Sequence, residues 1–235
     1  VTKPVSEGGL GFDYKWDLGW MHDTLCYFQT EPRLRPEHYH ELTFSMQYYY
    51  QERYLLPLSH DEVVHLKCSM INKMPGSYED KFANLKAGYT FMTGHPGKKL
   101  LFMGQEFGQM DEWNENRSLE WELLQYPVHK EMQEYVKALN HLYTTQPALY
   151  EMDYEPEGFE WINCTYNDEN IAIFIRKTKR PEDTLLFVCN FVPVAHEKFR
   201  VGVPFAGKYK EILNSDSVKF GGTGATNPRV KASKK

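Results

Sequence analysis

The stretch Leu56–His65, which reads LPLSHDEVVH, brings together side chains that could do chemistry. His60, Asp61 and Glu62 stand side by side directly after a short apolar run, Tyr54–Leu58. At the mouth of a strand, a carboxylate could hydrogen-bond the hydroxyls of a sugar, and a histidine could help to hold the ring. An ordinary polar loop that caps the next helix would have the same composition. The residues alone therefore leave a functional site and a structural turn equally open.

A zinc site in the same stretch is the first alternative, because histidine and glutamate side chains both bind zinc. In the helical zinc-protease motif the two histidines stand at positions i and i+4, on one face of the helix. His60 and His65 stand at i and i+5, which puts them about 140° apart around a helix. The spacing argues against zinc, and we expect no metal at this site.

The elements that would position these residues follow from hydrophobic periodicity, because residues 10–146 alternate apolar, strand-like runs with helically spaced apolar residues. Ser77 followed by Asp80 has the spacing of a capping box at a helix start. The predicted strands are residues 12–18, Tyr54–Leu58 and Leu100–Met103. The predicted helices are Trp20–Phe28, Pro36–Tyr49, Ser77–Gly94 and Met132–Tyr143.

This alternation of strand and helix is typical of a parallel sheet with helices outside it. In a (β/α)8 barrel the apolar part of each strand fills the interior, and polar residues emerge at the carboxyl end, where chemistry takes place. Three strand–helix units are too few to close a barrel. The remaining units must lie upstream, or the fold is a different one.

Residues 158–214 have another texture, with short strand-like runs and no convincing helix. The runs Phe159–Thr165 and Ile171–Arg176 flank the turn residues NDEN at 167–170, which predicts a hairpin. Further strands are predicted at 184–191, 198–203 and 208–213. Antiparallel strands without helices indicate a small sandwich. The Gly-rich and then basic tail, 221–235, is predicted to be flexible.

Several long motifs resemble, in the same order along the chain, the glycogen and starch branching enzymes of the alpha-amylase superfamily. LPLSHDEVVH resembles the fourth conserved region of that superfamily, in which a His-Asp pair follows the seventh barrel strand. The stretches GFDYKW at 11–16 and GWMHDTL at 19–25 are similar to the sixth strand and helix of bacterial branching enzymes. The other matching stretches are KFANL at 81–85, PGKKLLFMG at 96–104, EWN at 112–114, GFEW at 158–161 and EILNSD at 211–216. The resemblance is collinear from residue 1 to about residue 216.

The resemblance implies a role for individual residues in a retaining transfer of glucan chains. Asp61 would be the third catalytic carboxylate, which binds ring hydroxyls and stabilises the positively charged transition state. His60 would bind the same sugar. Glu62, Glu106 and Trp113 lie in similar motifs near the same face and are further candidates for substrate binding. An ordinary structural role fits each of these three equally well.

The resemblance also implies the fold class, α/β followed by all-β. Residues 1–148 would be the C-terminal part of a (β/α)8 barrel, with strands six to eight. Residues 149–235 would be an incomplete antiparallel β-sandwich domain, and at least one further strand would follow.

Two carboxylates that this chemistry needs are missing from the motifs. A retaining enzyme places a nucleophile and an acid/base about 5 Å apart, on either side of the scissile bond. The resemblance assigns the nucleophilic Asp to strand four and the acid/base Glu to strand five, and neither motif occurs in residues 1–235. We therefore expect residues 1–235 alone to show no branching turnover, since such residues act as one catalytic unit.

Charge and composition exclude several other classes. The formal net charge is -5, and the only basic cluster is the tail 229–235, so no nucleic-acid footprint is predicted. No apolar run approaches the roughly 20 residues of a membrane helix, and the given N-terminus has no signal-peptide pattern. The four cysteines, at 26, 68, 164 and 189, have no CxxC spacing and read as reduced thiols. We expect a cytoplasmic protein without cofactor and without nucleic-acid or membrane partners.

The leading hypothesis is a transferase whose full-length, monomeric form cleaves α-1,4 links in glycogen or amylose-like chains and forms α-1,6 branches. The alternatives are an α-glucan hydrolase of the same superfamily, a non-catalytic glucan-binding truncation product, and an unrelated α/β protein. Release of new reducing ends would distinguish the hydrolase from the transferase.

Overall fold

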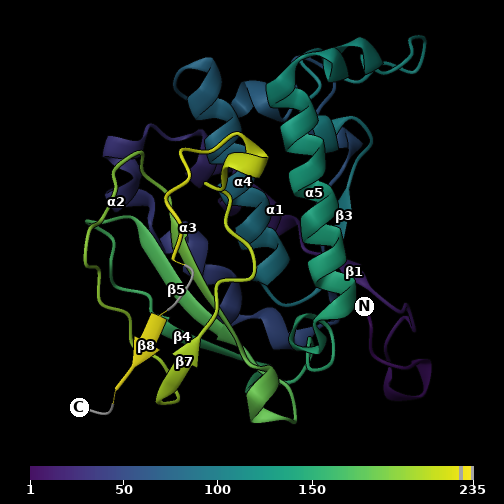
Figure 1. The fold of residues 1–235 in the computed structure, drawn as a ribbon. Coiled ribbons are helices and arrows are strands. Elements are labelled where there is room, and N and C mark those ends of the chain that lie inside the picture. The colour runs from purple at the N-terminus through teal and green to yellow at the C-terminus, as the bar shows by residue number, and fades with distance from the viewer. Residues whose placement is uncertain (228–229, 234–235) are drawn as a thin grey trace.

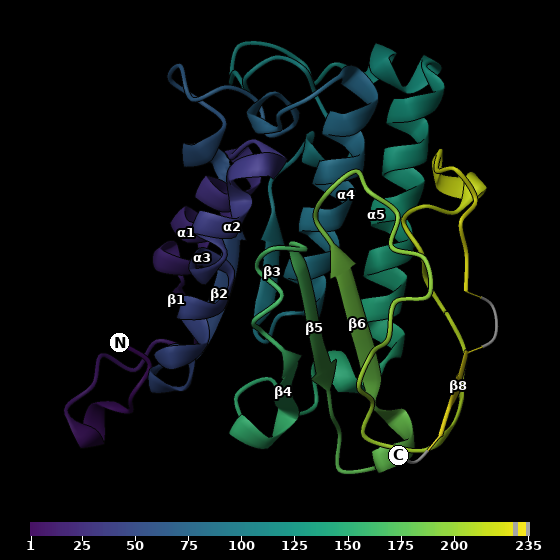
Figure 2. The same cartoon turned by 90° about the vertical axis from the view of Figure 1, so that its left-hand side faces the viewer.

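Three short strands form one parallel sheet in the computed structural model, which describes residues 1–227 and 230–233. The strands β1 (Lys15–Trp16), β2 (Tyr54–Leu58) and β3 (Lys98–Leu101) lie side by side in the order of the sequence (Figure 2). Both neighbouring pairs are parallel. The carboxyl ends of the three strands therefore lie at the same edge of the sheet.

A helix follows each of these strands, as the sequence predicts. Helix α1 (Leu18–Gln29) follows β1, α4 (Tyr78–Gly94) follows β2, and α5 (Pro127–Thr145) follows β3 (Figure 1). The first-position proline suits the start of α5, because proline has no N–H to leave unpaired there. The buried residues of α5 recur at helical spacing and form the face that packs inward: His129, Met132, Tyr135, Val136 and Leu139.

The start of α4 confirms the predicted capping box. The backbone N–H of Asp80 donates to the Ser77 hydroxyl over 3.2 Å, and the Asp80 carboxylate accepts from the Ser77 N–H over 3.1 Å. These two bonds satisfy N–H groups that a helix start leaves without a partner.

The predicted helix Pro36–Tyr49 is wrong as a single element. The structure has two short helices, α2 (Arg35–His38) and α3 (His40–Thr43), followed by 3-10 turns. Tyr39, at the break, donates its hydroxyl to the carbonyl of Ile171 over 2.7 Å. The backbone of Tyr39 stays right-handed helical (φ −58°, ψ −29°), and the chain leaves the helical region further on, at Tyr48 (φ −121°, ψ −6°).

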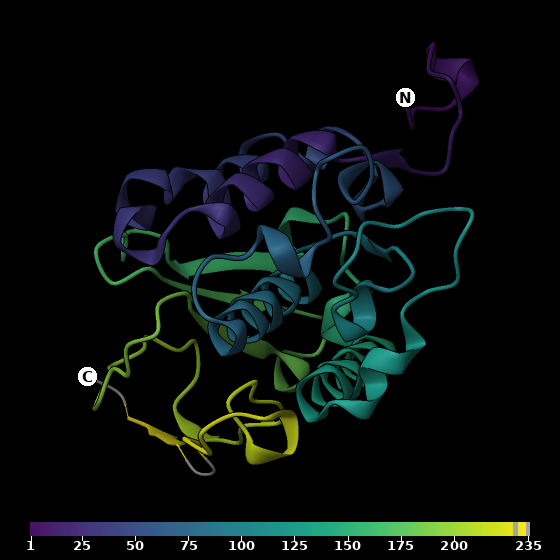
Figure 3. The ribbon, with the colours of Figure 1, turned by 90° about the horizontal axis from the view of Figure 1, so that it is seen from above.

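A second sheet holds the antiparallel strands β4 (Phe159–Asn163), β5 (Ile171–Arg176) and β6 (Leu185–Asn190). Antiparallel pairing of β4 with β5 confirms the predicted hairpin. All six residues of the central strand β5 are buried, so both of its faces are covered. In Figure 3, α1 to α3 lie on one side of this sheet and the C-terminal segment lies on the other.

The C-terminal end of α4 packs directly on this second sheet. The ring of Phe174 lies edge-on to Phe91, with centroids 6.0 Å apart, and is stacked on Phe187 at 5.0 Å. The lack of a side chain at Gly94 lets the rings of Phe174 and Phe187 approach the end of α4. A Cβ at that position would lie 2.8 Å from both rings. The two sheets therefore share one hydrophobic core through α4.

A buried ion pair joins the two sheets at the amino end of β3. The guanidinium of Arg176, which is fully buried, donates to the Asp153 carboxylate over 2.7 Å and to the Gly94 carbonyl over 2.9 Å. The same carboxylate accepts from Lys98 at 2.9 Å and from the Gly97 N–H at 3.2 Å. Asp153 and Arg176 together thus link β3, β5 and the end of α4.

The C-terminal segment departs from the sequence prediction in two places. No strand forms at 198–203, where Lys198 has a left-handed backbone (φ 56°) that an extended strand excludes. The strand predicted at 208–213 is reduced to β7 (Gly207–Tyr209), which pairs antiparallel with β8 (Val230–Ala232).

The tail at 221–235, predicted to be flexible, makes hydrogen bonds over part of its length. The Asp216 carboxylate accepts from the backbone N–H groups of Thr223 and Ala225. Residues 228–229 and 234–235 of this tail lie outside the described residues. At the other end, residues 1–14 project from the body and expose Val5, Leu10 and Phe12 (Figure 1).

None of the helices in the described residues is long and apolar enough to cross a membrane.

The substitution Asp153→Asn is expected to lower the free energy of unfolding by about 3–5 kcal/mol, because it leaves a buried guanidinium without its carboxylate. Burial acts to raise the pKa of the Asp153 carboxyl, but cationic neighbours led by Lys99 and Arg176 outweigh burial and hold that pKa below 3.8. The contribution is therefore present at neutral pH and is lost only as the pH falls below about 4. Urea unfolding of the purified protein across this pH range measures it.

Glu134→Gln is the matched control, because the Glu134 side chain is 41% exposed and lies 4.0 Å from Lys137 on the outer side of α5. We expect it to change stability by less than about 1 kcal/mol. Equal effects of the two substitutions would contradict a special role for the buried pair.

Candidate functional site

The predicted site residues lie at the carboxyl edge of the parallel sheet, where β2 ends. Leu56, Pro57 and Leu58 are buried, so the end of the strand is fixed in the core. Ser59 follows in an extended conformation, and residues His60–Glu62 then form one 3-10 turn. This arrangement puts the ionisable side chains just beyond the rigid end of the middle strand, as the sequence predicts.

Ser59 fixes the side chain of Asp61. Ser59 is buried, with 2% of its surface exposed, and its hydroxyl donates to Oδ1 of Asp61. The same hydroxyl lies 3.2 Å from Nδ1 of His60. Asp61 is half-buried and His60 is exposed, so both remain accessible to a ligand.

Phe102 brings His60 and Trp113 into one group. It follows β3 directly, and its N–H donates to the carbonyl of Leu58 over 3.0 Å. Its ring lies 5.9 Å from the His60 ring and 5.3 Å, edge-on, from the Trp113 ring, measured between centroids. The two candidates thus both contact one phenylalanine, which follows β3 and is hydrogen-bonded to the end of β2.

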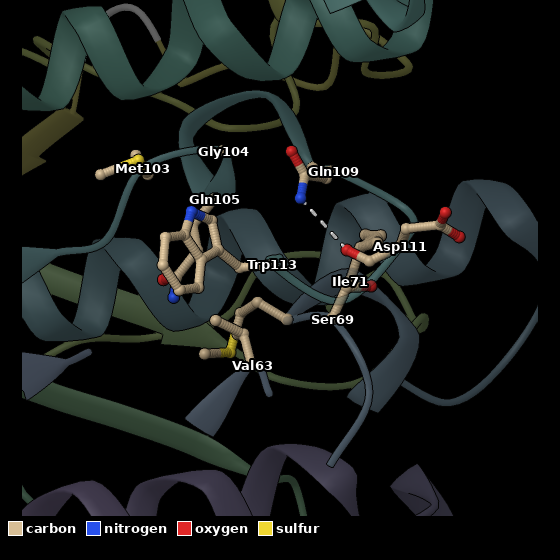
Figure 4. Close-up of a pocket in the computed structure, with 11 residues that line it drawn as sticks. Val63, Ser69, Ile71, Met103, Gly104, Gln105, Gln109, Asp111 and Trp113 are labelled. Atoms are coloured by element: carbon tan, nitrogen blue, oxygen red, sulfur yellow. Dashed lines mark hydrogen bonds between the residues drawn. The ribbon is translucent and has the colours of Figure 1, made fainter. Parts of the chain in front are cut away.

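A small hollow opens between the loop after β2 and the loop after β3. Figure 4 shows the Trp113 indole beside Gln105 and Met103, with the Val63 side chain nearby. Gln109 donates to the carbonyl of Asp111 over 3.3 Å across this hollow. The full lining is Val63, Ser69, Met70, Ile71, Met103, Gly104, Gln105, Gly108, Gln109, Asp111 and Trp113.

The two glutamates among the candidates are engaged elsewhere. Glu62 forms an ion pair with Lys67 at 3.1 Å, and Glu106 accepts from the N–H of Gly104 at 2.7 Å. Neither of them lines the hollow. Of the five candidates, only Trp113 lines the hollow. Phe102 connects Trp113 with His60, and Ser59 connects His60 with Asp61. Glu62 and Glu106 bond within their own loops.

The chemistry available at this edge is recognition of hydroxyl groups. Asp61 supplies acceptors, His60 supplies a ring nitrogen, and the Trp113 ring offers an apolar face of the kind on which a sugar can stack. No group of three or more metal-binding side chains lies together in the described part of the chain.

Two contributors to this geometry have weak signals in the sequence. Ser59 is part of the LPLSHDEVVH motif, but nothing in its type predicts a bond to Asp61. Phe102 reads as the end of an apolar strand, and its position between two rings depends on the pairing of β2 with β3.

The comparisons with known proteins begin with a domain family. Residues 161–235 match the family described as the C-terminal all-beta domain of alpha amylase. The chain therefore carries a domain of the alpha-amylase type after its mixed helix-and-sheet part.

Three curated proteins that match almost the whole chain are 1,4-alpha-glucan branching enzymes. The chain is 54% identical over 227 residues to the 1,4-alpha-glucan branching enzyme of Gloeobacter violaceus. The aligned residues make up 97% of this chain and 31% of that enzyme. The chain is 52% identical over 227 residues to the enzyme of the same name from Oceanobacillus iheyensis, covering 97% and 36%. For that of Halothermothrix orenii the identity is 51% over 230 residues, covering 98% and 36%. The predicted resemblance to the branching enzymes is confirmed, and the chain spans about a third of the length of these curated relatives.

Ser59→Ala is expected to release the Asp61 side chain from its present position, because it removes the hydroxyl that donates to Oδ1. Loss of one such bond should cost about 1 kcal/mol of stability. A crystal structure of the variant, with thermal unfolding, measures both effects.

Ser77→Ala is the control, since loss of the cap on α4 should cost a similar amount, about 1 kcal/mol, while Asp61 stays in place. An Asp61 carboxylate that keeps its position in Ser59→Ala would contradict the role given to Ser59.

Proposed function

We propose that residues 1–235 are part of a 1,4-α-glucan branching enzyme, a retaining transferase. The observation that carries this proposal is the 54% identity over 227 residues to an enzyme of that name. In this proposal the whole protein cleaves an α-1,4 link, holds the glucan chain covalently, and transfers it to a 6-hydroxyl of a glycogen or amylose-like chain.

The topology supports an assignment of β1, β2 and β3 to strands six, seven and eight of a (β/α)8 barrel. The strands are parallel, adjacent in sequence order, and each is followed by a helix. Barrel enzymes carry their active sites at the carboxyl ends of the strands. In this proposal the exposed apolar side chains of Val5, Leu10 and Phe12 face the remaining barrel elements.

The reaction proceeds in two displacements. A nucleophilic carboxylate attacks the anomeric carbon, the α-1,4 bond breaks, and the acid/base carboxyl group protonates the departing 4-oxygen. The 6-hydroxyl of the acceptor then loses its proton to the acid/base carboxylate and displaces the nucleophile. Both of those carboxylates come from barrel strands outside residues 1–235. One glycosidic bond replaces another, so no reducing end is gained in total.

Asp61 is the third carboxylate of this reaction. Its position beyond the end of β2 and the Ser59 bond that orients it support a role in binding ring hydroxyls as positive charge develops on the sugar. His60, which stays exposed beside it, binds the same sugar.

Trp113 is the next residue that we assign to the glucan, because its ring lines the hollow beside Phe102. Glu62 and Glu106 have structural roles in this proposal, because their carboxylates hold their own loops. Residues 149–235 form an accessory β-sandwich domain. The protein acts in the cytoplasm, a location consistent with the absence of any disulfide among its four described cysteines.

Asp61→Asn in the full-length protein is expected to lower branching turnover by at least about 10³-fold, because a residue of a catalytic unit is lost. Turnover is measured as the fall in iodine colour of amylose. Asp168→Asn, at an exposed position of the hairpin turn, is the matched control and should leave the rate unchanged.

Counting reducing ends in the same reaction separates the candidate functions. A fall in iodine colour without new reducing ends supports the transferase. A parallel rise in reducing ends would identify a hydrolase, and no turnover by the unsubstituted full-length protein would favour a glucan-binding protein.

A further inference from the structure

The loop that follows the His60–Glu62 turn has an unusual backbone. His65, Leu66 and Cys68 all adopt left-handed conformations, with φ of 57°, 67° and 66°. None of them is glycine, and L-residues adopt this region only at a cost in free energy. Leu66 is also 96% exposed, so burial of its side chain does not offset that cost. Something else must hold the loop in this shape.

Glu112 is bound to this loop through both of its carboxylate oxygens. Oε1 accepts from the N–H of Cys68 over 2.7 Å, and Oε2 accepts from the N–H of Leu66 over 3.1 Å. Hydrogen bonds from N–H groups to an ionised carboxylate are stronger than those between neutral groups. Both donors belong to left-handed residues, so Glu112 binds the strained part of the loop directly.

Residues next to Glu112 in the sequence also hydrogen-bond to this loop and its flanks. The N–H of Trp113 donates to the Val63 carbonyl over 3.0 Å. At the other end of the loop, Ser69 and Asn72 each donate to the Met110 carbonyl over 2.8 Å. The segment 110–113 is thereby bonded along the whole length of residues 63–72.

The loop is connected in turn to the candidate site. Val63 directly follows the His60–Glu62 turn, and its N–H donates to the His60 carbonyl over 3.0 Å. Lys67, between the left-handed residues, forms the 3.1 Å ion pair with Glu62. A shift of residues 65–68 would therefore displace the His60–Glu62 turn in two ways. It would pull on the backbone through Val63, and it would pull on the Glu62 side chain through Lys67.

We propose that Glu112 is a positioning residue, which holds the strained loop His65–Cys68 and through it keeps Asp61 and His60 in the geometry that the transfer reaction requires. This inference rests on the proposed function and assigns a role to a residue outside its five candidates. Glu112 itself does not touch the reacting atoms.

The test uses Glu112→Gln in the full-length protein. An amide keeps one acceptor oxygen and turns an N–H₂ group toward the second donor, so one of the two bonds is lost. We expect the kcat for branching of amylose to fall by roughly tenfold to 10²-fold, with KM changed by less than about twofold. Amide hydrogen exchange at Leu66 and Cys68 should accelerate in the same variant. Glu112→Asp, which keeps the charge and both oxygens, should recover part of the lost kcat and preserves the test if the amide variant folds poorly.

Glu115→Gln is the matched control, because Glu115 is exposed three residues after Glu112. In the described part of the chain its side chain accepts a hydrogen bond from Asn116 alone. This substitution should change neither the kcat nor the amide hydrogen exchange at Leu66 and Cys68.

Two results would overturn the proposal. Faster exchange in Glu112→Gln with an unchanged kcat would make Glu112 merely structural, and unchanged exchange in Glu112→Gln would contradict the claim that it holds the loop. If the unsubstituted full-length protein does not branch amylose, the proposed function fails, and the positioning role fails with it. An active enzyme with a normal Glu112→Gln kcat removes only the positioning role.

Discussion

The buried carboxylate of Asp153 is the constraint on which the arrangement of this chain depends. It faces the buried guanidinium of Arg176 at 2.7 Å, and it also binds Lys98 at the first residue of β3. An ion pair in the core stabilises a fold only when its partners are all in place, because desolvation of either charge alone is costly. The pair therefore favours the arrangement in which Arg176 of the antiparallel sheet reaches both Asp153 and the Gly94 carbonyl at the end of α4. The aromatic contacts of Phe91 and Phe174 then fill the space beside it.

The Asp153 ion pair and the candidate site lie at opposite ends of the same short strand, β3. β3 has four residues, which corresponds to roughly 13 Å at the usual rise of a strand. Its first residue, Lys98, donates to Asp153, and the residue after its last, Phe102, contacts the rings of both His60 and Trp113. Rigid elements of this kind hold functional side chains more precisely than loops do. The loop after β2 is the exception, and there the backbone is strained and held by Glu112.

Much of this arrangement could be predicted from the sequence, because local rules and tertiary packing agree there. The capping box at Ser77, the strand Tyr54–Leu58 and the hairpin around 167–170 all follow from residue types and spacing. The predictions fail where hydrophobic spacing does not determine the backbone conformation. The segment from Pro36 changes to 3-10 turns after Thr43, and Lys198 is left-handed at the first position of the predicted strand 198–203. For the site, the motif places His60 and Asp61 correctly at a strand end. The left-handed loop has no sequence signal, because its residues are not glycines.

The central claim is that this chain supplies one of three carboxylates in a glucan-transferring site, with the other two encoded before it. Reading the coding sequence immediately upstream of Val1 tests this directly. The account predicts an Asp and then a Glu, each at the end of a strand-like run, which would supply the nucleophile and the acid/base that Asp61 assists. An in-frame start codon or unrelated sequence at that place would contradict it, because no catalytic pair would then exist for Asp61 to assist.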